Sequence, residues 1–104
     1  MALAKAFFLL PLRDNDGRDL STEIAEVRTE LYARFAAWTL EGFVEGAYQM
    51  SDATQAMDRS AKYMIFLDET RIGELEEVLR DFKRKTTQEK IYLELQRNVE
   101  IRLI

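Results

Sequence analysis

The sequence predicts an α+β fold in which two helices pack on one face of an antiparallel sheet. Two segments, residues 20–35 and 70–84, repeat apolar side chains at the three-and-four spacing of a buried helix face. The segments before, between and after them alternate or are apolar throughout, as strands do. The length of 104 residues fits a single domain, 1–104, with a real core.

The first predicted strand spans residues 4–12, where both alternating sets of side chains are apolar. Phe8 and Leu10 belong to one set, and Phe7 and Leu9 belong to the other. Because such a strand is covered on both faces, we expect it at the centre of the sheet.

The first predicted helix begins at Ser21 or Thr22, either of which can cap it. The second begins at Asp68 or Thr70 and ends in a basic cluster. The apolar stripes that we expect to be buried are Leu20, Ile24, Val27, Leu31 and Phe35 in the first helix, and Ile72, Leu75, Val78, Leu79 and Phe82 in the second.

Two further strands are predicted between the helices, over residues 38–48 and 60–67. Strict alternation in the first places both of its glycines and Tyr48 toward the helices, and Phe43 on the opposite face. Glycine weakens a strand, so the presence of each of these two glycines needs an explanation. We consider three explanations: close packing of a helix, a β-bulge, and room for a ligand.

Alternating apolar and polar residues in the last part of the chain predict two strands, over residues 91–95 and 99–103. If residues 96–98 form a three-residue hairpin loop ending on a left-handed Asn98, all their apolar side chains share one face. The alternative is one long strand whose end reaches a partner subunit. The complete order is ferredoxin-like, β-α-β-β-α-β with an additional C-terminal strand, in an antiparallel sheet with two helices on one face.

The chain contains no cysteine and no histidine. Disulfides and metal sites built on thiolate or imidazole are therefore excluded. The loop 14–19, with Glu23 beyond it, resembles a calcium-binding loop, but Leu12 stands where the first carboxylate is needed. We therefore predict a solvated turn, no metal site and no cofactor.

The formal net charge is −4, from 15 Lys and Arg against 19 Asp and Glu. A nucleic-acid surface needs the opposite sign on one face, and the one basic cluster, residues 80–85, lies where the second helix should end. No apolar run approaches the ~20 residues of a membrane span. We expect a cytoplasmic protein with no nucleic-acid and no membrane partner.

The sheet face away from the helices is predicted to be apolar as well. A monomer would leave this surface exposed to water, and a patch of this kind marks an interface. We therefore expect the chain to pair with itself, as a homodimer or a higher homo-oligomer. The predicted interface residues are Phe7, Leu9, Phe43, Met64 and Phe66.

Short pieces along most of the chain resemble a known family. They are Arg34-Phe35, Trp38-Thr39, Gly46, Arg59-Ser60, Phe82-Lys83 and Gln88-Glu89. Together they resemble a family of small uncharacterised bacterial proteins with a ferredoxin-like core, which implies the fold. In outline the chain is also similar to the dimeric α+β barrel proteins, which include small monooxygenases and dehydratases. That similarity implies a cofactor-free enzyme, without the histidine that many of those proteins use.

A second set of polar residues would surround a small pocket on the helix side of the sheet; the alternative is that its tyrosines belong to the core and its charged residues to the rim or to caps. Arginines in the set would hold a carboxylate or phosphate, and a Tyr and a Glu would serve as acid and base. The candidate ligand-binding residues are Arg34, Tyr48, Arg59, Tyr63, Gln88 and Glu89. The sequence thus predicts an oligomeric binding or regulatory module for a small anionic metabolite, with a cofactor-free enzyme as the alternative.

Overall fold

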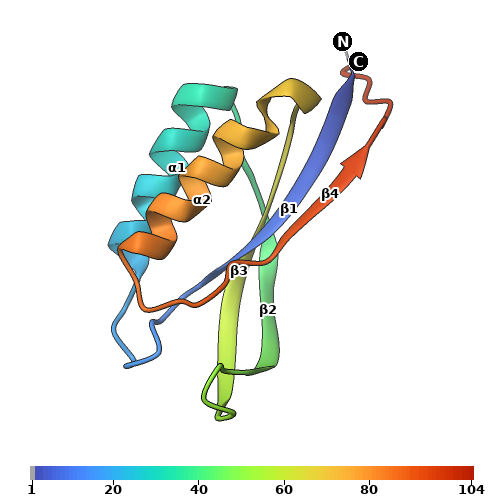
Figure 1. Ribbon diagram of the computed structural model, residues 1–104. Coiled ribbons are helices and arrows are strands. Elements are labelled where there is room, and N and C mark those ends of the chain that lie inside the picture. The colour runs from blue at the N-terminus through green and yellow to red at the C-terminus, as the bar shows by residue number, and fades with distance from the viewer. Residues whose placement is uncertain (1) are drawn as a thin grey trace.

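The computed structural model describes residues 2–104 and confirms the predicted α+β order (Figure 1). The sheet order is β2-β3-β1-β4, and every neighbouring pair is antiparallel. This is the ferredoxin-like arrangement, with the two helices on one face. The elements are β1 (Leu3–Pro11), α1 (Ser21–Phe35), β2 (Thr39–Gln49), β3 (Gln55–Asp68), the 3-10 turn η1 (Glu69–Arg71), α2 (Ile72–Arg84) and β4 (Leu93–Arg97).

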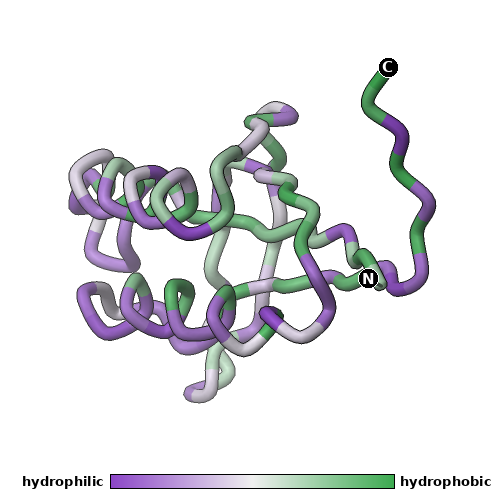
Figure 2. The backbone as a smooth tube through the Cα atoms, turned by 90° about the horizontal axis from the view of Figure 1, so that it is seen from above, coloured by the Kyte–Doolittle hydropathy of each residue, from purple (hydrophilic) through white to green (hydrophobic). Residues whose placement is uncertain are grey.

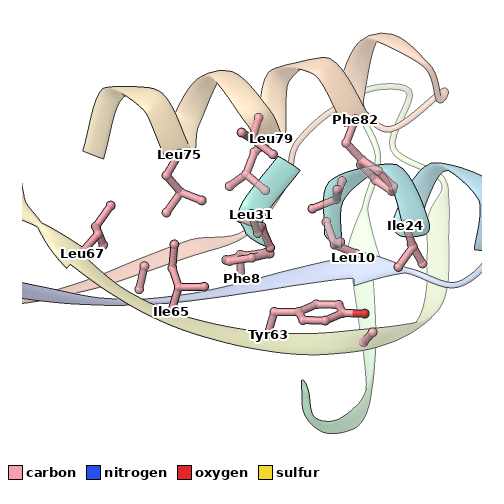
Figure 3. Close-up of a cluster of buried hydrophobic side chains, with 14 of the residues drawn as sticks. Phe8, Leu10, Ile24, Leu31, Tyr63, Ile65, Leu67, Leu75, Leu79 and Phe82 are labelled. Carbon is pink, nitrogen blue, oxygen red and sulfur yellow. The ribbon is translucent and has the colours of Figure 1, made fainter. Parts of the chain in front are cut away.

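The core lies between the sheet and the two helices (Figure 3). As predicted, β1 is central, and its Phe8 and Leu10 are completely buried against the helices. The stripes of α1 and α2 meet them, with Leu31 and Leu75 also at 0% exposure. Burial of these aliphatic and aromatic side chains is the main source of stability for a chain without disulfides.

The two helices start differently from one another. Asp68, one of the two caps predicted for the second helix, caps the 3-10 turn η1, where its side chain accepts a hydrogen bond from the Thr70 backbone N–H at 2.9 Å. α2 itself follows at Ile72, with Arg71 at its cap position and no side-chain bond there. At α1 the prediction was wrong, because the cap position is Leu20 and it makes no side-chain bond. Instead, Asp19 reaches forward and accepts from the Ser21 N–H at 2.7 Å.

A β-bulge in β2 corrects the predicted faces of that strand. The register with β3 shifts between Leu40 and Gly42, and Gly42 has a φ of 149°. A bulge adds one residue, so every later side chain changes face. Phe43 therefore pairs with Ala61 on the helix side, whereas Tyr48 lies on the opposite side, the reverse of both predictions.

The additional C-terminal strand does not form, which corrects the predicted hairpin. Asn98 does take the left-handed conformation, with a φ of 55°. However, residues 98–104 carry no strand, and the Val99 N–H donates to the Leu3 carbonyl at 3.3 Å rather than turning back along β4. Figure 2 shows this segment leaving the body of the molecule.

The molecule is longer than a sphere of the same mass. Its radius of gyration is 14.2 Å, with extents of 44 × 24 × 23 Å, against about 13 Å expected for a compact domain of this size. The β2–β3 hairpin accounts for much of this, because it extends well past the helices (Figure 1). Within residues 2–104, neither helix has the length and hydropathy that a membrane crossing requires.

Candidate functional site on the open face of the sheet

A large cavity lies on the sheet face away from the helices, which we call the open face. Its volume is about 640 Å³, a size typical of sites for small molecules. Side chains at the ends of β1 and β3 form its floor. The connection from α2 to β4, residues 88–93, forms one wall, and the end of β2 with its turn, residues 48–51, forms the other.

Asp58 is the charged group on the floor of this cavity. It pairs with Gly46 of β2, so its carboxylate is flanked by a residue without a side chain. Burial raises the pKa of Asp58, and no hydrogen bond or cation among the described residues lowers it again. A half-buried, unpaired carboxylate in a cavity is a group that a ligand can satisfy.

Two tyrosines stand over the same cavity from opposite walls. Tyr48 extends from β2, and its ring lies across Gly46, where a Cβ would stand only 2.5 Å from the Tyr48 hydroxyl. Tyr92 extends from the other wall, and its hydroxyl donates to Glu94 at 2.8 Å. That hydrogen bond raises the pKa of Tyr92, with a smaller contribution from Tyr48. Both rings are about half exposed, at 44% and 52%, so a flat ligand can stack on them.

Two residues that the sequence singled out hold the walls in place. The Glu89 side chain accepts a hydrogen bond from the Ser51 backbone N–H at 3.2 Å, which joins the connection to the tip of the hairpin. The Gln88 side chain is buried and donates to the Asp14 carboxylate at 3.1 Å. The cavity is therefore bounded by segments that are tied to other parts of the chain.

Asp14 anchors the connection between α2 and β4 through several hydrogen bonds. Its side chain is 1% exposed and accepts from the Thr87 hydroxyl at 2.6 Å and from the Asn15 N–H at 3.0 Å. Burial by itself would raise the pKa of Asp14, but these hydrogen bonds, with that from Gln88, lower it to about 2. The predicted calcium-like loop thus uses its first carboxylate to bind the chain itself, and residues 2–104 hold no cluster of acidic residues suited to a metal ion.

The structure brings together three of the six predicted ligand-binding residues. Tyr48, Gln88 and Glu89 line the cavity. The two arginines lie elsewhere. Arg34 pairs with Glu30 on the surface of α1 at 2.9 Å, and Arg59 lies on the helix side of the hairpin, with its guanidinium 5.7 Å from the ring centre of Phe43.

Tyr63 belongs to the core and not to the cavity. It is 0% exposed, and its ring stacks on Phe8 with 5.8 Å between ring centres (Figure 3). Its hydroxyl accepts from the Arg28 guanidinium at 2.6 Å, and Arg28 also lies 4.6 Å from the ring centre of Trp38. The sequence pattern gave no sign of this buried contact, because Arg28 falls outside the apolar stripe of α1.

Sequence reasoning missed Asp58 and Tyr92. Asp58 lies before the predicted strand over residues 60–67, whereas β3 in fact begins at Gln55. Tyr92 was predicted as a residue of the alternating strand 91–95 and of the apolar sheet face, without a role in ligand binding. No signal in the sequence set Asp58 apart, because it stands among the polar residues Gln55, Arg59 and Ser60.

The apolar residues of the open face are partly covered by their own chain. Phe7 is only 9% exposed, because the Lys5 and Lys62 ammonium groups lie 5.1 and 4.9 Å from its ring centre. Leu9, Met64 and Phe66 share this face and are half-buried. Phe43, the fifth predicted interface residue, lies on the other face because of the bulge.

Comparison with known proteins supports the fold. No protein-family model matches the chain, and no curated protein is similar to it in sequence. The fold is similar to that of a phage SAM lyase in complex with S-methyl-5'-thioadenosine, with a TM-score of 0.67 and 13% identity over 93% of this chain and 81% of that one. It is also similar to a phage SAM lyase in the apo state, with a TM-score of 0.64 and 13% identity over 93% and 80%. The shared feature is the small α+β fold.

Proposed function

We propose that the chain binds a small molecule in the open-face cavity, and that this molecule joins a flat ring system to a positive charge. The observation that carries the proposal is the unpaired carboxylate of Asp58 between two exposed tyrosine rings. An aromatic ring can stack on tyrosine, and a cation can neutralise a carboxylate that burial has left without a partner.

The charges around the cavity favour a cation over the anionic metabolite predicted from the sequence. That prediction depended on Arg34 and Arg59, and both lie outside the cavity. The lining carries two carboxylates, Asp58 and Glu89, against the single ammonium group of Lys90. An anionic ligand would face net repulsion there.

S-adenosylmethionine is the first molecule to test. It carries a sulfonium centre and an adenine ring, and S-methyl-5'-thioadenosine is its neutral counterpart without the cationic centre. A phage SAM lyase of similar fold has been seen with the latter compound. In this chain, the residues expected to bind either compound are Asp58, Tyr48 and Tyr92.

Titration calorimetry with both compounds tests the proposal. We expect saturable binding of each, and tighter binding of the cation. Asp58→Asn should weaken S-adenosylmethionine binding about tenfold and leave the neutral compound within about threefold. Arg59→Gln, on the opposite face, is the matched control and should change neither. The absence of binding by either compound, in protein shown to be folded, would overturn this choice of ligand.

A cofactor-free enzyme is the second candidate, because Asp58 and Tyr48 in the cavity can each carry a proton. The pKa of Asp58 is raised, which brings a carboxylate closer to the range of a useful base. The Tyr48 hydroxyl lies over Gly46, the residue of β2 that pairs with Asp58. Chromatography of S-adenosylmethionine incubated with the protein tests this reading: a new product that disappears in Asp58→Asn supports an enzyme, and unchanged ligand leaves binding alone.

Self-association through the open face is also proposed, as a homodimer or higher homo-oligomer. The half-buried Leu9, Met64 and Phe66 support it, since they remain accessible beside the cavity. Light scattering coupled to gel filtration tests it. Met64→Lys should lower the measured mass, whereas Lys83→Glu on the far side of α2 should not, and a monomer of 12.2 kDa for the unmodified chain would contradict it.

A further inference from the structure

We infer that residues 98–104 add a fifth strand to β4 of a second copy of the chain. We call these residues the 98–104 segment. In it, the apolar Val99, Ile101 and Leu103 alternate with the charged Glu100 and Arg102, which is the pattern of a strand with one apolar face. In the single chain it makes no strand, and Leu103 is 85% exposed. Figure 2 shows the alternating hydropathy along this protruding segment.

The outer edge of β4 is the surface that this segment fits. β4 is the last strand of the sheet and pairs only with β1, so its outer row of N–H and C=O groups is free. On its helix side, Leu93 and Leu95 pack against the core but stay half-exposed. A strand laid here with its apolar side chains on the same face would cover them.

The segment is directed away from its own β4. Asn98 turns the chain with its left-handed conformation, and its N–H donates to Glu69 at 3.2 Å. The next N–H, that of Val99, donates to Leu3 of β1 at 3.3 Å. These contacts hold the start of the segment on the β1 side of β4, opposite the free edge.

Charge selects the register and shows why a second copy is needed. Glu94 is the one acid of β4, and Arg102 faces it when Ile101 lies opposite Leu95. Within one chain, this register would leave a single residue, Asn98, as the loop, which is shorter than any hairpin allows. The three-residue loop predicted from the sequence would instead place Glu100 against Glu94, a pair of like charges.

The other edge of the sheet fits less well. β2 is irregular there, because it carries the bulge between Leu40 and Gly42. Gly42 and Gly46 also offer no side chain to an added strand. The exchange uses the outer edge of β4 and not the apolar residues through which self-association is proposed. It meets the cavity only at Glu94, which also accepts a hydrogen bond from Tyr92.

Disulfide trapping tests the inference cleanly, since the chain has no cysteine of its own. Glu94→Cys in a copy with a size tag and Arg102→Cys in an untagged copy should form a mixed disulfide on oxidation. Two pairings serve as controls: Glu94→Cys with Glu100→Cys, and Glu45→Cys on β2 with Arg102→Cys. Equal or better trapping in either control pairing, or none in the first, would overturn the inference.

Charge reversal gives a second, independent readout on the full chain. Arg102→Glu should weaken dimerisation through the edge of β4 about tenfold, because it places two acids opposite each other. Adding Glu94→Arg should restore dimerisation, because the two opposite charges then face each other again with their positions exchanged. Met64→Lys on the open face should leave trapping through the edge unchanged. A double variant no better than Arg102→Glu alone would contradict this register, and trapping abolished by Met64→Lys would show that the open face, not the edge, carries the contact.

Discussion

The ring of Tyr48 occupies the space that a side chain at Gly46 would fill. A Cβ there would stand 2.5 Å from the Tyr48 hydroxyl and 2.7 Å from the ring carbon that bears it. Of the three reasons considered for the glycines of this strand, the bulge applies to Gly42, whereas the reason for Gly46 is room for a side chain of the same strand and was not among them. Gly42 serves the bulge, and Gly46 lets an aromatic ring lie flat beside the cavity.

Gly46→Ala should therefore displace Tyr48 from the cavity while the protein stays folded. The ring is at the far end of a half-exposed side chain, so it can swing away from the new methyl group. We expect ligand affinity to fall about tenfold, the scale of one lost stacking contact. Gly73→Ala is the matched control, because a Cβ at that position meets no atom within 4 Å. Loss of affinity in the control as well would show a global effect and contradict this explanation.

Asp58→Asn should make the ligand-free protein more stable at pH 7, although it weakens binding of a cation. Burial raises the pKa of Asp58 in the folded state, so the ionised form costs stability once the pH rises above the pKa of the unfolded chain. The gain from the variant should thus be present at pH 7 and vanish below about pH 4. Chemical denaturation at both pH values measures it, and a variant less stable at pH 7 would show that Asp58 is paired.

S-adenosylmethionine binding should also weaken on acidification. The loss of affinity should begin at a higher pH than it would for an aspartate with an ordinary pKa. The carboxylate attracts a cation only while ionised, and its raised pKa brings protonation to higher pH. The neutral thioether compound should show little of this dependence. Calorimetry across the acid range compares the two profiles, and parallel profiles would argue against a charge contact at Asp58.

Asp14→Asn should destabilise the fold by about 2 kcal/mol at pH 7. The folded-state pKa of Asp14 is about 2, against an ordinary value of 3.8, so its ionised form is stabilised by the hydrogen bonds that it accepts. This contribution is complete above about pH 4 and is lost as the pH falls toward 2. Asp16→Asn, in the exposed part of the same loop, is the control. Equal denaturation midpoints for the two variants at pH 7 would refute the role of Asp14.

Tyr63→Phe should cost about 1–2 kcal/mol of stability, because the Arg28 guanidinium loses its acceptor beside the core. Ligand binding should survive, since Tyr63 lies on the helix side and outside the cavity. Tyr48→Phe is the complementary variant and should leave stability nearly unchanged. A Tyr63→Phe protein that folds normally but no longer binds the ligand would show that Tyr63 belongs to the binding site.

Local periodicity was enough to determine the elements and their order. The three-and-four spacing of Leu31 and the residues around it defined a helix, and the double apolar set around Phe8 defined a central strand, because helix and strand periods depend only on near neighbours in the chain. The left-handed conformation of Asn98 was also predicted, although the hairpin for which it was invoked does not form.

Tertiary structure decided what those elements present to one another. One extra residue at the bulge reversed the faces of Phe43 and Tyr48, which no periodic pattern could reveal, since register is fixed by the partner strand. The cavity then arose where three distant segments meet, and it took Gln88 and Glu89 but neither arginine. Residues 98–104 have the sequence of a strand and no partner within the chain, because a strand needs an edge within its reach as well as the pattern.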